Sequence, residues 1–216
     1  MNDALRGERT HDHYLSTFNH YLGIYGALRP EEISRRCALE FDEAKSGFAL
    51  RVMGTEYLAA FPDFGMTPLT GADFCSRTGK LLFLRYLCEG RYCGGTGGQV
   101  SYDALPWGEV YYKNFRGRCV SRLARAFGKD AGALDRVMRG SAGLRAEKLR
   151  QGDAGYRFEF LNGLYMSVIV WEGDEEFPPS AQMLFSDNFA FAFTAEDVAA
   201  AAEFAAGYLA SLGNDV

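Results

Sequence analysis

The chain has 216 residues, of which 48% are hydrophobic and 14% aromatic, so it can bury the core of a globular domain. Its formal net charge of −5 argues against a broad phosphate-binding surface, because nucleic-acid binders usually carry a basic face. The longest apolar runs fall far short of the ~20 residues that a membrane helix needs. The polar N-terminus lacks the pattern of a secretory signal. We therefore expect a cytoplasmic protein that binds neither nucleic acid nor membrane.

The N-terminal half is expected to contain helices and one hairpin. Apolar residues at helical spacing predict a first helix over 14–28, which Pro30 ends and which a second short helix follows. Alternating apolar residues over 48–61, interrupted at Gly54, predict a β-hairpin. A loop rich in Gly, Pro, Thr and Asp then leads to a short buried helix over 81–87.

A second loop, over residues 90–98, contains five glycines and is the best candidate for a boundary. Neither half has the polar, low-complexity composition of a free linker. The sequence therefore predicts a single domain over 1–216, with a possible subdivision near 90–105.

The C-terminal half predicts two further helices before its hairpin. Apolar residues recur every four positions from Trp107 to Phe127, which indicates a long amphipathic helix that Gly128 ends. Asp130 is expected to cap the helix that follows.

The clearest hairpin spans 156–171, because Asn162-Gly163 supplies the positive φ angles of a tight turn. The stretch 194–197 resembles a capping box and predicts a last helix up to Gly213. This order does not alternate strand and helix. It favours an α+β fold, with an antiparallel sheet built from hairpins and packed against several amphipathic helices.

An acidic cluster follows the second strand of that hairpin. Like charges so close together cost free energy unless water, a cation, an arginine or backbone donors offset the repulsion. Hard cations take several carboxylate oxygens, so the cluster is a candidate site for a cation or a small polar ligand. The candidate ligand-binding residues are Asp153, Trp171, Glu172, Asp174, Glu175 and Glu176. The competing interpretation is a solvated turn whose acids accept backbone hydrogen bonds and pair with arginines such as Arg157.

Other motifs are less specific. Two carboxylates in a pocket can act as general acid and base. Cys88 and Cys93 are spaced for a metal pair or a reversible disulfide, but no second pair completes a zinc site, and no metal ligand is assigned. The glycines of 94–98 lack the spacing of a phosphate-binding or dinucleotide loop. All three histidines precede residue 21, which argues against a histidine-activated nucleophile. The sequence names no cofactor.

The chain resembles a bacterial and archaeal family known as domain of unknown function 3786. The resemblance is carried in the C-terminal half by Leu105-Pro106-Trp107-Gly108, Phe127-Gly128, Gly152-Asp153, the string Trp171 to Pro178, Leu184-Phe185 and Glu196-Asp197. It is looser in the N-terminal half, through Arg36-Cys37-Ala38, Gly54 with Tyr57, and Leu84-Arg85-Tyr86-Leu87. The resemblance implies a cytoplasmic protein of anaerobes, without naming a reaction.

Three functions remain open from the sequence. The first is a binding module that holds a cation or a polar ligand at the acidic cluster. The second is an enzyme that uses two of the same carboxylates for proton transfer, in which case one acid should be desolvated beside an apolar wall. The third is an accessory protein of anaerobic metabolism with a protein partner, in which case Trp107, Trp171 or the tyrosines should form an exposed apolar patch.

Overall fold

A computed structural model describes residues 2–214, with the side chains of residues 12–141 and 143–213. The α-helices are α1 (Asn2–Ala27), α2 (Pro30–Cys37), α3 (Arg77–Glu89), α4 (Gly108–Phe115), α5 (Ser121–Phe127), α6 (Ala131–Gly140), α7 (Phe189–Ala192) and α8 (Ala195–Asn214). The π-helix η2 (Arg116–Val120) joins α4 to α5, and short 3-10 helices are η1 (Tyr102–Ala104) and η3 (Ala142–Leu144). The strands are β1 (Phe41–Asp42), β2 (Gly47–Val52), β3 (Thr55–Ala60), β4 (Met66–Pro68), β5 (Gln99–Ser101), β6 (Glu147–Lys148), β7 (Ala154–Leu161), β8 (Leu164–Trp171) and β9 (Ser180–Ser186).

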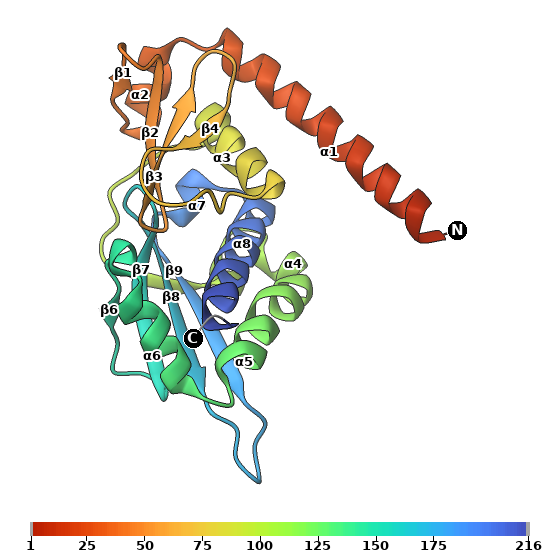
Figure 1. Cartoon of the computed structure of the whole chain (residues 1–216), viewed down its shortest axis with the longest axis vertical. Coiled ribbons are helices and arrows are strands. Elements are labelled where there is room, and N and C mark those ends of the chain that lie inside the picture. Colours follow the sequence, from red (N-terminus) through yellow and green to blue (C-terminus); the bar gives the residue numbers. More distant parts are fainter. Residues whose placement is uncertain (1, 215–216) are drawn as a thin grey trace.

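The strands form one nine-stranded sheet in the order β4-β3-β2-β7-β8-β9-β5, to which β1 and β6 add short pairings (Figure 1). Each pairing is antiparallel. The predicted α+β class and the antiparallel sheet are therefore confirmed. Whether the chain is a single domain, and whether it divides near 90–105, stay predictions.

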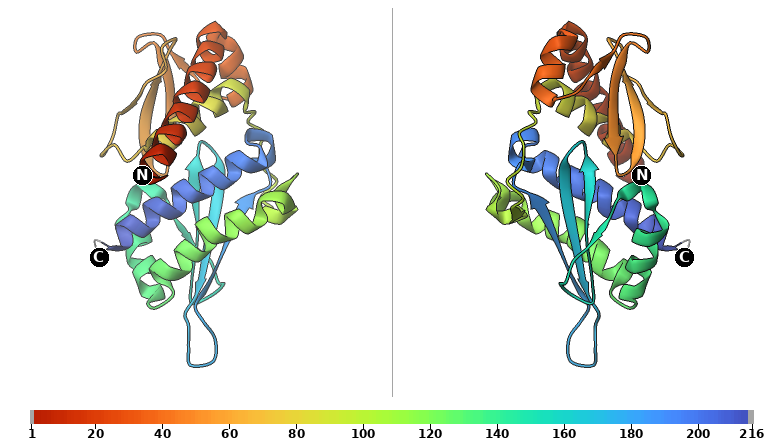
Figure 2. Two further views of the ribbon diagram at one scale, coloured as in Figure 1. Left: turned by 90° about the vertical axis from the view of Figure 1, so that its right-hand side faces the viewer. Right: turned by 90° about the vertical axis from the view of Figure 1, so that its left-hand side faces the viewer.

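Helices cover one face of the C-terminal strands. Figure 2 shows α8 lying across β7, β8 and β9, with α4 and α5 beside it on the same face. The inner side of α8 is lined by alanines at positions 201, 202, 205 and 206, all fully buried. Because alanine side chains are small, the neighbouring helices α3, α4 and α5 approach α8 closely, and the alanines share one core with phenylalanines of the strands.

The two hairpins predicted from turn residues are present. Residues 53–54 connect β2 to β3, and Asn162-Gly163 connect β7 to β8 with φ angles of 33° and 82°. The turns also join the two hairpins to each other. The backbone N–H of Arg51 donates to the Asn162 side-chain oxygen at 2.9 Å, and Val52 pairs with Leu161.

Several elements depart from the predictions. The expected helix over 107–127 contains the π-helix η2, and Trp107 is 78% exposed rather than on the buried stripe. Trp107 lies at the N-cap with φ of 66°, so its side chain leaves the helical face. The strands β4, β5 and β9 were not predicted. β4 and β5 have only three residues each, and β9 lies beyond the acidic cluster, where no strand was expected.

We predict that Gly163→Ala lowers the free energy of unfolding. The left-handed conformation costs a non-glycine residue about 1–2 kcal/mol, and an added Cβ would lie 2.9 Å from the Tyr92 hydroxyl oxygen. Urea unfolding measures the loss. Gly140→Ala is the control, since an added Cβ there meets nothing within 4 Å. Equal stability of the two variants would contradict the proposed strain in this turn.

Candidate functional site

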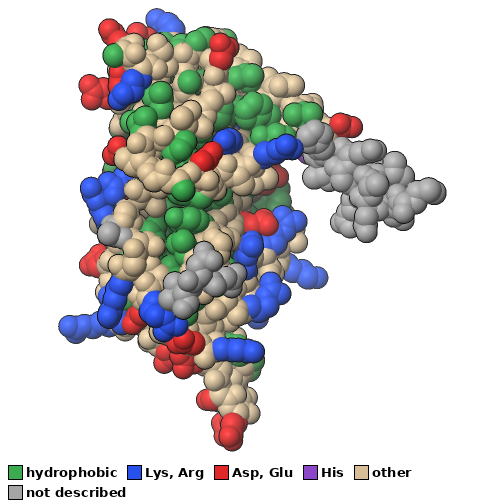
Figure 3. All heavy atoms as spheres, in the orientation of Figure 1, with side chains coloured by type: hydrophobic (Ala, Val, Ile, Leu, Met, Phe, Trp, Pro, Cys, Tyr) green, Lys and Arg blue, Asp and Glu red, His purple; other side chains and the backbone are tan. Residues whose placement is uncertain are grey.

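The acidic cluster lies at the tip of the β8–β9 hairpin, which projects beyond the body of the protein (Figure 1). Every residue from 171 to 180 is exposed, and Phe177 has 66% of its surface accessible. Acidic side chains occupy the tip of this projection in Figure 3. The candidate acids are therefore surrounded by water and are not enclosed in a cleft.

Asp174 is bonded to the backbone of its own turn. One of its carboxylate oxygens accepts from the N–H of Glu176 at 2.8 Å and from the N–H of Phe177 at 2.7 Å. The Asp174 N–H donates to the Phe177 carbonyl at 2.9 Å. The backbone donors of Phe177 and Glu176 lower the pKa of the Asp174 carboxyl, because they stabilise its charged form.

Asp153 and Glu172 connect the base of the hairpin to α6. An Asp153 oxygen accepts from the Glu172 N–H at 2.7 Å, so Asp153 does approach the cluster from the start of β7, as predicted. A Glu172 oxygen accepts from the N–H of Ala131, the first residue of α6, at 2.6 Å. Asp130 occupies the N-cap position as expected, but its carboxylate pairs with Arg136 at 2.8 Å.

The remaining predicted residues have fewer contacts. The structure gives no hydrogen bond or ion pair for the side chains of Glu175 and Glu176 among the described residues, and Trp171 is half-exposed. Arg157 pairs with Glu147 and stacks on Tyr165 rather than approaching the acids. Within the described part of the chain, no group of three or more His, Cys, Asp or Glu side chains is placed to hold a metal ion. Ligand binding by the cluster stays a prediction.

The predicted cysteine pair and glycine loop have structural neighbours. The Cys88 thiol is buried and donates to the Tyr21 carbonyl, while Cys93 is half-buried, and all five cysteines are free. In the glycine loop, Thr96 donates to the Asp187 carboxylate from both its N–H and its hydroxyl. These bonds lower the pKa of Asp187 and hold the loop against the end of β9.

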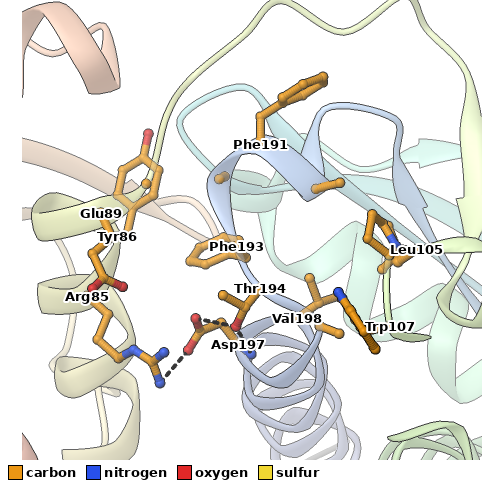
Figure 4. A pocket seen from close by; sticks show the side chains of 15 residues that line it. Arg85, Tyr86, Glu89, Leu105, Trp107, Phe191, Phe193, Thr194, Asp197 and Val198 are labelled. Carbon is orange, nitrogen blue, oxygen red and sulfur yellow. Dashed lines mark hydrogen bonds and ion pairs between the residues drawn. The ribbon is translucent and has the colours of Figure 1, made fainter. Parts of the chain in front are cut away.

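A pocket of about 250 Å³ lies away from the acidic turn, where α3, α7, α8 and the stretch 105–107 meet (Figure 4). We call it the Arg85–Asp197 pocket. It is lined by Arg85, Tyr86, Glu89, Gly90, Leu105, Pro106, Trp107, Ala190, Phe191, Ala192, Phe193, Thr194, Ala195, Asp197 and Val198. Most of these side chains are apolar, so the pocket has a mainly hydrophobic lining with a few polar groups.

An ion pair with a buried carboxylate forms one side of the pocket. Arg85 on α3 reaches Asp197 on α8 at 2.9 Å, and the Asp197 residue is only 6% exposed (Figure 4). The Thr194 hydroxyl donates to the other carboxylate oxygen at 2.8 Å. Its oxygen accepts from the Asp197 N–H at 3.3 Å, which is the N-cap bond expected of the predicted capping box. Burial raises the pKa of the Asp197 carboxyl, and the Thr194 hydroxyl and the Arg85 guanidinium oppose that rise.

Aromatic side chains surround the ion pair. The Arg85 guanidinium lies 5.2 Å from the ring centre of Tyr21, whose hydroxyl donates to Glu89 at 3.2 Å. Phe193 is buried in the pocket wall, whereas Trp107 and Phe191 are exposed at its rim. Arg85 thus links α1, α3 and α8.

The position of Trp107 at the rim depends on the next residue. A Cβ on Gly108 would lie 1.9 Å from the Tyr102 carbonyl oxygen, so only glycine fits where α4 starts. Because the backbones of Gly108 and Tyr102 lie so close together, residues 105–107, which precede α4, line the pocket. Trp107, in its left-handed conformation, then points its indole outward (Figure 4).

Sequence reasoning did not identify this pocket as a site. Arg85 and Asp197 are far apart along the chain, and only the capping role of Asp197 was predicted. One signal was present: three stretches that carry the family resemblance, 84–87, 105–108 and 196–197, each contribute residues to the lining.

The antiparallel sheet and the helices packed on it define an α+β protein, and the pocket is its candidate ligand site. The family model described as Domain of unknown function (DUF3786) matches residues 29–208, and the chain belongs to that family. Comparisons with curated proteins and with solved structures found no match. No helix in the described part of the chain is long and apolar enough to span a membrane.

We predict that Asp174→Ala lowers the melting temperature in a pH-dependent way. Because the folded-state pKa of Asp174 lies below its ordinary value of 3.8, its charged form stabilises the fold above that pH. The contribution is lost as the pH falls through the lowered pKa. Melting of wild type and variant from neutral pH to below pH 3.8 should therefore converge at the acid end. Glu175→Ala, the control, should melt like the wild type throughout, and a pH-independent loss for Asp174→Ala would contradict this role.

We predict that Glu172→Ala destabilises the fold by about 0.5–2 kcal/mol, the usual cost of losing a helix N-terminal cap. The variant leaves the Ala131 N–H without its acceptor. Glu172→Gln keeps an acceptor oxygen and should recover most of the loss in urea unfolding. If Glu172→Ala unfolds like the wild type, the carboxylate does not brace α6.

Proposed function

We propose that the protein is a binding module and that its ligand occupies the Arg85–Asp197 pocket. Known ligand pockets are concave and mostly apolar, with a small number of polar groups that fix orientation. This pocket has that composition, with a volume of about 250 Å³. Its size supports a small ligand with an apolar body of one ring or a short branched chain.

The observation that carries the proposal is the state of Arg85. One terminal nitrogen of its guanidinium is bound to Asp197, and among the described residues no other hydrogen bond or ion pair is given for the guanidinium, whose Nε is buried. Both Asp197 oxygens are already engaged. Since guanidinium has five donors and no acceptor, the unused bonding capacity belongs to a donor. This favours a ligand with an acceptor group, above all a carboxylate, because Arg–carboxylate bonds are strong and directional.

A second candidate function is acid–base catalysis by Asp197. Its raised pKa beside the apolar Phe193 and Val198 is the pattern of a catalytic carboxylic acid. The Thr194 hydroxyl and Arg85 occupy both of its oxygens, however, and so favour the binding role. The accessory-protein role would use the exposed rim, where Trp107 and Phe191 lie.

We expect phenylacetate to bind in this pocket more tightly than benzyl alcohol or benzylamine, because only the first offers a carboxylate to Arg85. Amide chemical shifts and thermal shifts during titration measure the three affinities. Ala190→Phe fills the pocket mouth and should weaken phenylacetate binding by about tenfold or more, which is ~1.4 kcal/mol. Ala126→Phe, on an exposed position of α5, is the matched control and should bind like the wild type.

A double variant tests the role of the charge. Arg85→Met with Asp197→Leu replaces the buried ion pair by apolar side chains, which buried pairs often tolerate, whereas removal of Arg85 alone would leave a buried charge. The double variant should bind phenylacetate and benzyl alcohol equally. Failure of all three compounds to bind the wild type, or a preference for benzylamine, would refute the proposed ligand class.

A further inference from the structure

A second hollow, of about 500 Å³, lies where α2 faces the segment that leaves α3. We call it the arginine cleft. Its lining residues are Leu28, Glu32, Arg35, Arg36, Arg91 and Tyr92. Half of these residues are arginines, in a protein whose net charge is −5. The cleft is therefore a local concentration of positive charge and not part of a generally basic surface.

The backbone fixes the walls of the cleft. The Arg36 guanidinium donates to the carbonyls of Leu87 and Cys88, both at 2.6 Å, and so caps the end of α3. The Arg36 carbonyl accepts from the Tyr92 N–H at 2.8 Å. The Arg91 N–H donates to the Phe191 carbonyl at 3.1 Å. These bonds hold α2 beside residues 91–92, so the positions of the arginine backbones are set before any ligand binds.

The positive charges of Arg35 and Arg91 are not neutralised by the other residues that line the cleft. Arg35 and Arg91 are exposed, and among the described residues neither side chain has a hydrogen bond or an ion pair. Glu32, the one acid in the lining, accepts from the backbone N–H of Arg29 at 3.3 Å and pairs with the Arg29 guanidinium at 3.7 Å. The carboxylate is thus used in the capping box of α2. Two guanidinium groups remain available to an anion.

We propose that the arginine cleft binds a small molecule through a phosphate group held between Arg35 and Arg91. Guanidinium presents its N–H groups as a planar fork that matches phosphate oxygens, and charge-assisted bonds of this kind are about twice as strong as neutral ones. The cleft is larger than a phosphate ion, and Leu28 and the Tyr92 ring provide an apolar wall for the rest of the molecule. This site is separate from the Arg85–Asp197 pocket and does not depend on its proposed ligand.

The probe for this proposal is pyrophosphate, titrated by calorimetry into the full chain at about 50 mM salt, where screening is moderate. The wild type should show one saturable site. Arg35→Gln with Arg91→Gln should weaken binding by about tenfold or more. Arg116→Gln with Arg125→Gln is the matched control, because it removes two charges from exposed helical positions elsewhere and leaves the cleft intact. The control should bind within about twofold of the wild type.

Three results would overturn the proposal. The first is binding that does not saturate in the wild type. The second is an equal loss in both double variants, which would mean that pyrophosphate responds only to overall charge. The third is binding of malonate as tightly as pyrophosphate, which would make the cleft a carboxylate site. Melting curves of both double variants establish that each is folded, as expected for exposed side chains.

Discussion

The architecture depends on a very short contact between two hairpins. β2 and β7 pair at one residue pair, Val52 with Leu161, and the backbone of Met53 donates to Phe160 at 2.9 Å. The Asn162 side chain adds a bond to the Arg51 N–H, and the partly buried Arg51–Glu159 ion pair closes the same junction at 3.0 Å. These few contacts, together with the packing of α3 against α8, place the two halves of the sheet relative to each other. The Asn162-Gly163 turn therefore closes its own hairpin and also bonds the N-terminal hairpin through Arg51.

The Arg85–Asp197 pocket is a product of that joint. Arg85 belongs to α3, which follows the N-terminal hairpin, whereas Asp197 begins α8, which lies on the C-terminal strands. The 2.9 Å ion pair forms only if the two halves have one fixed relation. A cavity at the meeting of helices from both halves is also where ligand sites commonly lie. The acidic cluster, in contrast, belongs wholly to the C-terminal half. Three of its acids accept backbone N–H bonds: Asp153 from Glu172, Glu172 from Ala131, and Asp174 from Glu176.

The features predicted from sequence are those with local causes. Proline at position 30, the Asn162-Gly163 turn and the Thr194–Asp197 capping box each act within a few residues, and each is present. Strands β4 and β5 are too short to give a periodic signal. The helical spacing at Trp107 predicted burial, but a left-handed backbone at the N-cap overrides periodicity. The Arg85–Asp197 contact depends on tertiary packing. Neither helical nor strand periodicity in the sequence reveals such a contact. The acids of the hairpin tip are adjacent in sequence and so form a recognisable pattern, whereas the residues of the pocket are far apart along the chain.

The segment from Glu89 to Tyr92 has a consequence for how the protein responds to its surroundings. Glu89 and Gly90 line the Arg85–Asp197 pocket, while Arg91 and Tyr92 line the arginine cleft, so one stretch of backbone is a shared wall. The bond from Arg91 to Phe191 ties this wall to α7 at the pocket rim. An occupant of either hollow therefore contacts a backbone segment that also borders the other hollow. Where occupancy of one hollow alters the affinity of the other, thermodynamic linkage requires the same factor in both directions.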